Sequence, residues 1–136
     1  MDRITVKTSV KADIDKVWKY WTKPEHITNW NFATDEWICP SAENHLKPNG
    51  TFSWRMEAKD GSMGFDFEGT YEKIVDKELI SYKMSDGRKV DVEFTPNGTE
   101  TIVSETFDAE GTNPDEQQRE GWQAILGNFK RYVESE

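Results

Sequence analysis

Three Asx–Gly dipeptides constrain the fold of this chain more than any other feature. Asp60-Gly61, Asp86-Gly87 and Asn97-Gly98 each lie between segments in which apolar and polar residues alternate. These dipeptides readily adopt the left-handed backbone of a tight hairpin turn, so they are strong short-range signals for β-hairpins. Asp76-Lys77-Glu78 is a weaker turn signal between two further alternating segments. The second half of the chain is therefore predicted to be an antiparallel meander in which each strand pairs with the next.

Each alternating segment presents one apolar face, as a half-buried strand does. A first strand is expected over residues 4–10, and residues 36–39 form a possible short strand. The apolar positions of the meander are Phe52, Trp54 and Met56; Met63, Phe65, Phe67 and Tyr71; Ile80, Tyr82 and Met84; Val90, Val92 and Phe94; and Thr101, Val103 and Phe107.

Two helices are expected between the first strand and the meander. Asp13 can cap a helix whose apolar stripe has the spacing i, i+3, i+4, i+7, namely Ile14, Val17, Trp18 and Trp21. Thr22 is expected to cap a short second helix, with Pro24 in its first turn and Glu25 completing a capping box.

A long helix is predicted over about residues 114–133. Asn113 is its expected cap, Pro114 its first residue, and Asp115 and Glu116 face the positive end of the helix dipole. Its apolar face carries Trp122, Ile125, Leu126, Phe129 and Val133. The order is β-α-α-β(5–6)-α, and no repeat or linker divides the chain. We expect one α+β domain over residues 1–136.

This order of elements predicts a cavity. The curved sheet must bury its apolar face, and one helix about 10 Å wide cannot fill the concave side. We therefore expect a ligand site between the sheet and the last helix. The alternative is a packed core without a ligand site, because the inward residues are bulky. The candidate ligand-binding residues are Trp54, Met56, Phe65, Phe67, Tyr82, Phe94, Glu105, Trp122 and Leu126.

Two sets of residues leave alternatives open. Trp18, Trp21 and Trp30 have helical spacing and are interpreted as core rather than as a ligand cage. Glu105 shares a strand face with Val103 and Phe107, so it points into the apolar space unless a bulge near the strand end turns it outward. Asp66 and Glu68 alternate with the inward aromatic residues and are expected on the outer surface.

The charge and the cysteine content restrict the partners and the compartment. A net charge of −9 disfavours nucleic acid and anionic membrane surfaces. No apolar run approaches the roughly 20 residues that span a bilayer, and the first residues pass directly into a strand pattern rather than a signal peptide. Cys39 is the single cysteine, so no internal disulfide can form. We expect a cytoplasmic protein without nucleic-acid or membrane partners.

No metal or cofactor is expected. His26, His45 and Cys39 are scattered, without the spacing of a metal site. The chain also contains no glycine-rich phosphate loop, nucleophile elbow or Cys/His pair. No catalytic residue is therefore assigned.

Several short motifs resemble those of one fold superfamily. Val17-Trp18, Thr22-x-Pro24-Glu25 and Trp30 resemble its first helices. Gly50-x-Phe52 and Gly69-x-Tyr71 resemble two of its strands, and Gly121-Trp122 with Leu126 and Asn128 resembles its C-terminal helix. With these motifs in this order, the chain resembles the helix-grip superfamily of START domains, birch-pollen-allergen-like proteins and polyketide cyclases. Within it, the chain is most similar to the family named after the activator of the heat-shock chaperone ATPase.

The resemblance implies a curved antiparallel sheet wrapped around a long C-terminal helix, but the fold hosts several activities. Our first hypothesis is non-catalytic binding of a small apolar or amphipathic ligand, such as a lipid, a polyketide or a flavonoid-like molecule. The second is a stress-related module that docks a chaperone or another protein. The third is a cyclase-like enzyme that uses a cavity carboxylate as acid or base. A monomer or a weak dimer is expected.

Overall fold

The computed structural model describes residues 3–136 and contains seven strands and three helices within them. Among these helices, none combines the length and the apolar character that crossing a membrane demands. In chain order the elements are β1 (Arg3–Val10), α1 (Ile14–Thr22), α2 (Pro24–Ile27), β2 (Trp37–Asn44), β3 (Thr51–Ala58), β4 (Gly64–Val75), β5 (Leu79–Met84), β6 (Lys89–Asn97), β7 (Glu100–Asp108) and α3 (Asp115–Ser135).

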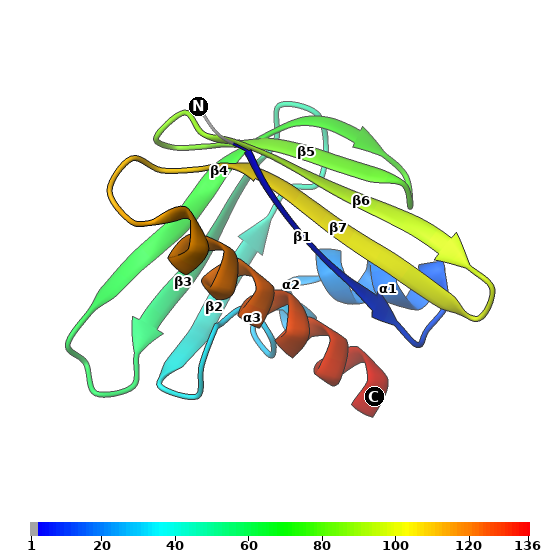
Figure 1. Cartoon of the computed structure of the whole chain (residues 1–136), viewed down its shortest axis with the longest axis horizontal. Coiled ribbons are helices and arrows are strands. Elements are labelled where there is room, and N and C mark those ends of the chain that lie inside the picture. Colours follow the sequence, from blue (N-terminus) through cyan, green and yellow to red (C-terminus); the bar gives the residue numbers. More distant parts are fainter. Residues whose placement is uncertain (1–2) are drawn as a thin grey trace.

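The seven strands form one antiparallel sheet in the order β1-β7-β6-β5-β4-β3-β2. The meander predicted from the turn dipeptides is confirmed. Gly87 and Gly98 have φ angles of 96° and 67°, the left-handed backbone that a tight turn requires. Only β1, which comes from the start of the chain, joins the sheet out of sequence, beside β7. The sheet arches around α3, as Figure 1 shows.

α3 is fastened along the edge strand β1. The Lys130 ammonium group donates to the Ser9 carbonyl at 2.6 Å, and the Gln123 amide donates to the Lys7 carbonyl at 3.2 Å. The Lys11 backbone N–H in turn donates to the Glu134 carboxylate at 2.9 Å. These contacts cover an edge that would otherwise be open to pairing with another strand. They also hold α3 across the concave face of the sheet.

The C-terminal half of α3 packs tightly against α1 and the segment after α2. Leu126, Phe129 and Val133 are fully buried. The Phe129 ring makes T-shaped contacts with Trp21 and Trp30, each at 4.8 Å between ring centroids. Aromatic pairs of this geometry add to the stability that area burial alone provides. This end of the concave face is therefore filled by side chains.

The helix caps agree only in part with the sequence prediction. The Asp13 carboxylate accepts from the Lys16 N–H at 2.9 Å and caps α1 as predicted. Thr22, however, does not cap α2: its hydroxyl donates to the Trp18 carbonyl at 2.8 Å, within the last turn of α1. A threonine hydroxyl readily bonds back to the carbonyl four residues earlier in a helix. The predicted Thr22 cap is therefore wrong.

The start of α3 and the length of β2 also differ from prediction. Pro114 occupies the cap position rather than the first helical position, and no side chain caps the helix. β2 extends to Asn44, and its register shifts between Ile38 and Ser41, around Pro40. Such a bulge moves side chains between faces and removes the simple alternation. The sequence pattern therefore indicated only the first part of this strand.

Candidate functional site

A cavity of about 490 Å³ lies between the N-terminal half of α3 and the concave face of the sheet. This volume is in the range of sites that hold small molecules. The residues that line it come from α1 and the segment after α2, from the sheet and its turns, from the β7–α3 loop and from α3. They are Trp21, Trp30, Asn31, Trp54, Met56, Phe65, Asp66, Phe67, Glu68, Tyr82, Met84, Ser85, Asp86, Arg88, Glu105, Glu110, Asn113, Gln117, Gln118, Trp122 and Ile125.

Aromatic rings form the walls of the cavity. Trp54 on β3 and Phe67 on β4 are cross-strand partners, with ring centroids 5.8 Å apart. Trp122 on α3 reaches Phe67 from the opposite side at 6.3 Å and stacks on Phe107 of β7 at 4.0 Å. The stack fixes the orientation of the indole ring. The site is therefore a preformed aromatic enclosure.

Glu105 places a carboxyl group inside this enclosure. It pairs with Val6 of β1 and Val92 of β6 in an unbroken register, so no bulge turns it outward. Its side chain is 5% exposed, and no hydrogen bond or ion pair to it occurs within residues 3–136. Burial in apolar surroundings raises the pKa of Glu105 to about 8. The carboxyl group is therefore mostly protonated at neutral pH while the cavity is empty.

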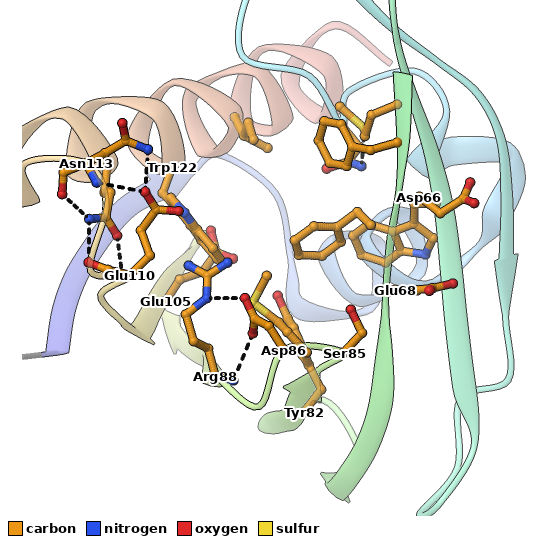
Figure 2. A pocket seen from close by; sticks show the side chains of 18 of the residues that line it. Asp66, Glu68, Tyr82, Ser85, Asp86, Arg88, Glu105, Glu110, Asn113 and Trp122 are labelled. Atoms are coloured by element: carbon orange, nitrogen blue, oxygen red, sulfur yellow. Dashed lines mark hydrogen bonds and ion pairs between the residues drawn. The ribbon is translucent and has the colours of Figure 1, made fainter. Parts of the chain in front are cut away.

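Tyr82 is the second buried polar group of the cavity. It lies on β5, on the same concave face as Glu105, and its hydroxyl has no hydrogen-bond partner in the described part of the chain. Burial, and then the negative charge of Glu105, raise the pKa of Tyr82 well above its ordinary value. Figure 2 shows where the side chains of Tyr82, Glu105 and Trp122 lie around the cavity. Both groups are free to contact a bound molecule.

Charged and amide side chains surround the mouth of the cavity. Arg88 donates to the Asp86 carboxylate at 2.8 Å, and Arg55 lies 3.5 Å from Asp66. On the helix side, the Gln118 side chain accepts from the Glu110 N–H at 2.9 Å and donates to the Asn113 carbonyl at 2.8 Å. This side chain holds the β7–α3 loop against the first turn of α3.

The structure brings seven of the nine predicted ligand-binding residues to this cavity, and their role in binding stays a prediction. They are Trp54, Met56, Phe65, Phe67, Tyr82, Glu105 and Trp122. Phe65 lies at the mouth and is 47% exposed. Phe94 and Leu126 do not line the cavity. Phe94 packs against Trp18 at 5.1 Å between centroids, and Leu126 is fully buried in the filled end of the concave face.

Sequence reasoning missed several lining residues. Trp21 and Trp30 belong to the core, as interpreted, but they also form part of the cavity wall. Asp66 and Glu68 are exposed, as expected, and reach the cavity at its rim. Arg88 follows the Asp86-Gly87 turn, a position that indicated only a turn. Nothing in the sequence pattern signals that this turn lies over the cavity.

No group of three or more His, Cys, Asp or Glu side chains in residues 3–136 is arranged to hold a metal ion. The indole N–H of Trp54 is the one fully buried side-chain polar atom in this part of the chain without a partner. The chemistry of the site thus depends on aromatic surface, one buried carboxyl group and one buried phenol.

Comparison with known proteins identifies the family. The family model for activator of Hsp90 ATPase homolog 1-like proteins matches residues 11–134. The solution structure of the AHSA1-like protein from Aeromonas hydrophila is 42% identical, covers 98% of this chain and 93% of that one, and superposes with a TM-score of 0.93. The protein Chr148 from Cytophaga hutchinsonii is 53% identical over 98% and 92% of the two chains, with a TM-score of 0.85.

A more distant structure shares the fold alone. The protein CV1439 from Chromobacterium violaceum is 19% identical over 98% of this chain and 99% of that one, with a TM-score of 0.87. No curated protein matches the sequence. The family model covers nearly the whole chain, and the A. hydrophila structure agrees with it in sequence and fold. The chain therefore belongs to the family of activator of Hsp90 ATPase homolog 1-like proteins, and its fold is the helix-grip fold.

Proposed function

We propose that this protein binds a small, largely apolar molecule between the sheet and α3 without transforming it chemically. The observation that carries the proposal is the aromatic cavity with one buried, unpartnered carboxyl group, Glu105. Apolar walls with a few polar groups that orient the ligand are typical of small-molecule sites.

Burial of the ligand supplies the binding energy in this proposal. About 200 Å² of apolar ligand surface, at roughly 25 cal/mol per Å², contributes about 5 kcal/mol before the costs of association. Trp54, Phe67 and Trp122 provide the contact surface, and their mutual packing limits the side-chain entropy lost on binding. Glu105 and Tyr82 would then select the orientation of the ligand.

A cavity-filling variant tests this proposal. Ile125→Trp introduces an indole at an α3 residue that lines the cavity, while Glu120→Trp adds the same group at an exposed position of α3. The neutral fluorophore 1-aminoanthracene should bind the wild type and Glu120→Trp with increased emission, and binding should be lost in Ile125→Trp. Circular dichroism checks that both variants fold. Equal binding to all three proteins would place the fluorophore elsewhere and reject the cavity as the site.

Native mass spectrometry of the freshly purified protein complements this experiment. A retained small molecule that disappears in Ile125→Trp, but not in Glu120→Trp, would support the proposal and identify the ligand.

A second candidate function is docking to a protein partner such as a chaperone. Its support is a pair of apolar side chains at the β3–β4 hairpin, Met63 and Phe65, which are 62% and 47% exposed. Large exposed apolar side chains gathered at one place are typical of interaction surfaces. The family name directs the test toward a chaperone of the Hsp90 class.

The second candidate predicts a change in the ATPase rate of a purified Hsp90-class chaperone when this protein is added. Met63→Ser should weaken that change while the cavity still binds 1-aminoanthracene. An ATPase rate that the wild-type protein does not alter would reject the candidate.

A further inference from the structure

The cavity lining has a strong excess of negative charge. Besides the buried Glu105, the lining includes four acidic residues, Asp66, Glu68, Asp86 and Glu110, whereas Arg88 is its one cationic residue. Arg88 is already ion-paired with Asp86 at 2.8 Å. Asp66 has a partner in Arg55 at 3.5 Å. A ligand with a carboxylate, such as a free fatty acid, would enter this site against its charge.

Glu105 lies where a cation would interact most favourably. Its carboxyl group is buried, faces the cavity and has no ion pair within residues 3–136. Trp54, Phe67, Tyr82 and Trp122 line the same space, and aromatic rings attract a positive charge through the ring quadrupole. A carboxylate and an aromatic cage together are the chemistry that recognises an organic ammonium group.

We propose that the ligand is an organic cation, with an ammonium or quaternary ammonium group on an apolar body and the charge directed at Glu105. This inference rests on the proposed function. The cost of desolvation is the main term against a buried ion pair. That cost is smallest for a quaternary ammonium group, which is large and weakly hydrated. The aromatic faces then replace part of the water that the cation loses.

The arrangement couples binding to proton release. Glu105 holds its proton up to about pH 8 in the empty cavity, and a bound cation stabilises the ionised form. Tyr82 on β5 is a neutral phenol, and so is Tyr71 on β4, which contacts Tyr82 but does not line the cavity. Arg88 beside β6 is paired with Asp86, and Glu110 lies at the mouth. Val6 on β1 and Trp122 on α3 do not titrate. Affinity for a cation that does not itself titrate should therefore rise with pH below about 8, by up to tenfold per pH unit.

Three probes of nearly the same shape test which charge on the ligand the cavity prefers. Phenyltrimethylammonium is the cation, tert-butylbenzene its neutral isostere, and 2-methyl-2-phenylpropanoate the corresponding carboxylate. Dissociation constants are measured by NMR titration of the tryptophan indole N–H signals between pH 6 and pH 8. At pH 8 the cation should bind most tightly and the carboxylate least tightly. Only the cation should gain affinity as the pH rises.

Glu105→Gln removes the group that can ionise while it keeps the shape of the side chain. We expect this variant to bind phenyltrimethylammonium at least tenfold more weakly, without pH dependence, and to bind tert-butylbenzene within twofold of the wild type. Glu93→Gln makes the same substitution at an exposed position of β6 and should alter neither affinity.

The outcomes separate this inference from the proposed function. If no probe binds the wild-type protein, the proposed function itself fails. If the probes bind, but the neutral isostere or the carboxylate binds most tightly, the cation proposal is overturned and the cavity remains a binding site. A flat pH profile for phenyltrimethylammonium, or equal effects of Glu105→Gln on the cation and on its isostere, would overturn it as well.

Discussion

At the scale of single residues, Glu105 shows how a fold perturbs the chemistry of one side chain. Its neighbours on the same strand face, Val103 and Phe107, are fully buried, so the carboxyl group enters apolar surroundings. Its pKa rises from 4.5 to about 8 because burial penalises the charged form. The folded protein therefore holds this proton more tightly than the unfolded chain does. Between these two pKa values the folded protein loses stability as the pH rises.

We expect Glu105→Gln to remove this loss. Below about pH 4.5 both proteins carry a neutral side chain, and their stabilities should be similar. As the pH rises toward 8, the variant should gain on the wild type by roughly 1.4 kcal/mol per pH unit at most. Urea unfolding at pH 5, 6.5 and 8 measures the difference, with Glu93→Gln as the exposed control. Parallel pH profiles for Glu105→Gln and the wild type would contradict the buried, unpaired state of Glu105.

At the scale of the elements, Gly69 lets three strands approach closely. It pairs with Phe52 of β3 and Met84 of β5. A Cβ atom at this position would lie 2.5 Å from the Lys83 carbonyl oxygen and 2.9 Å from the Phe52 ring. The ring of Phe52 packs in turn on Trp54, which forms the cavity wall, at 5.2 Å. The space beside Gly69 therefore helps to set the curvature on which the site depends.

Gly69→Ala should destabilise the protein by about 1–3 kcal/mol, the usual cost of forcing an extra methyl group into a packed core. Gly121→Ala is the matched control, because a Cβ atom there meets nothing within 4 Å. Gly121 lies inside α3, so its replacement should instead stabilise the protein by about 0.5–1 kcal/mol. Thermal unfolding of the two variants measures both effects. Equal shifts in the same direction would show that the backbone at Gly69 relaxes freely.

At the scale of the whole molecule, α3 divides the concave face into a filled end and a hollow end. Its C-terminal half buries Leu126, Phe129 and Val133 against Trp21 and Trp30. Its N-terminal half borders the cavity through Trp122 and Ile125, which are only partly buried. Local stability should follow this division, because regions with fewer buried contacts open more easily.

Hydrogen exchange should therefore be faster in the amides of residues 117–123 than in those of residues 126–133. Occupation of the cavity by 1-aminoanthracene should slow exchange in the first segment and leave the second nearly unchanged. Exchange measured by NMR with and without the fluorophore resolves the two halves. Uniform protection along α3 would contradict the division, and unchanged exchange on binding would place the fluorophore away from the helix.

The sequence by itself determined the local structure and the faces of the strands. The Asx–Gly dipeptides set the hairpins, because their backbone preference acts over two residues, and the alternation placed Glu105 on the face of Val103 and Phe107. Asp13 capped α1 as predicted for the same local reason. Period-two and helical patterns thus predicted the meander and the long C-terminal helix. The predicted caps at Thr22 and Asn113 depended on the path of the chain between elements, and they failed.

Only the tertiary structure decided which part of the concave face stays open. Phe94 and Phe67 have the same kind of strand position, yet Phe94 lies beneath α1 and Phe67 faces the cavity. The difference arises from contacts between distant segments: Lys130 and Gln123 hold α3 along β1, and Phe129 fixes its C-terminal half against Trp21 and Trp30. The unbroken register of β7 with β1 and β6 likewise directs Glu105 inward. A one-dimensional pattern assigns a face to each residue, but the side chains that cover this face come from elsewhere in the chain.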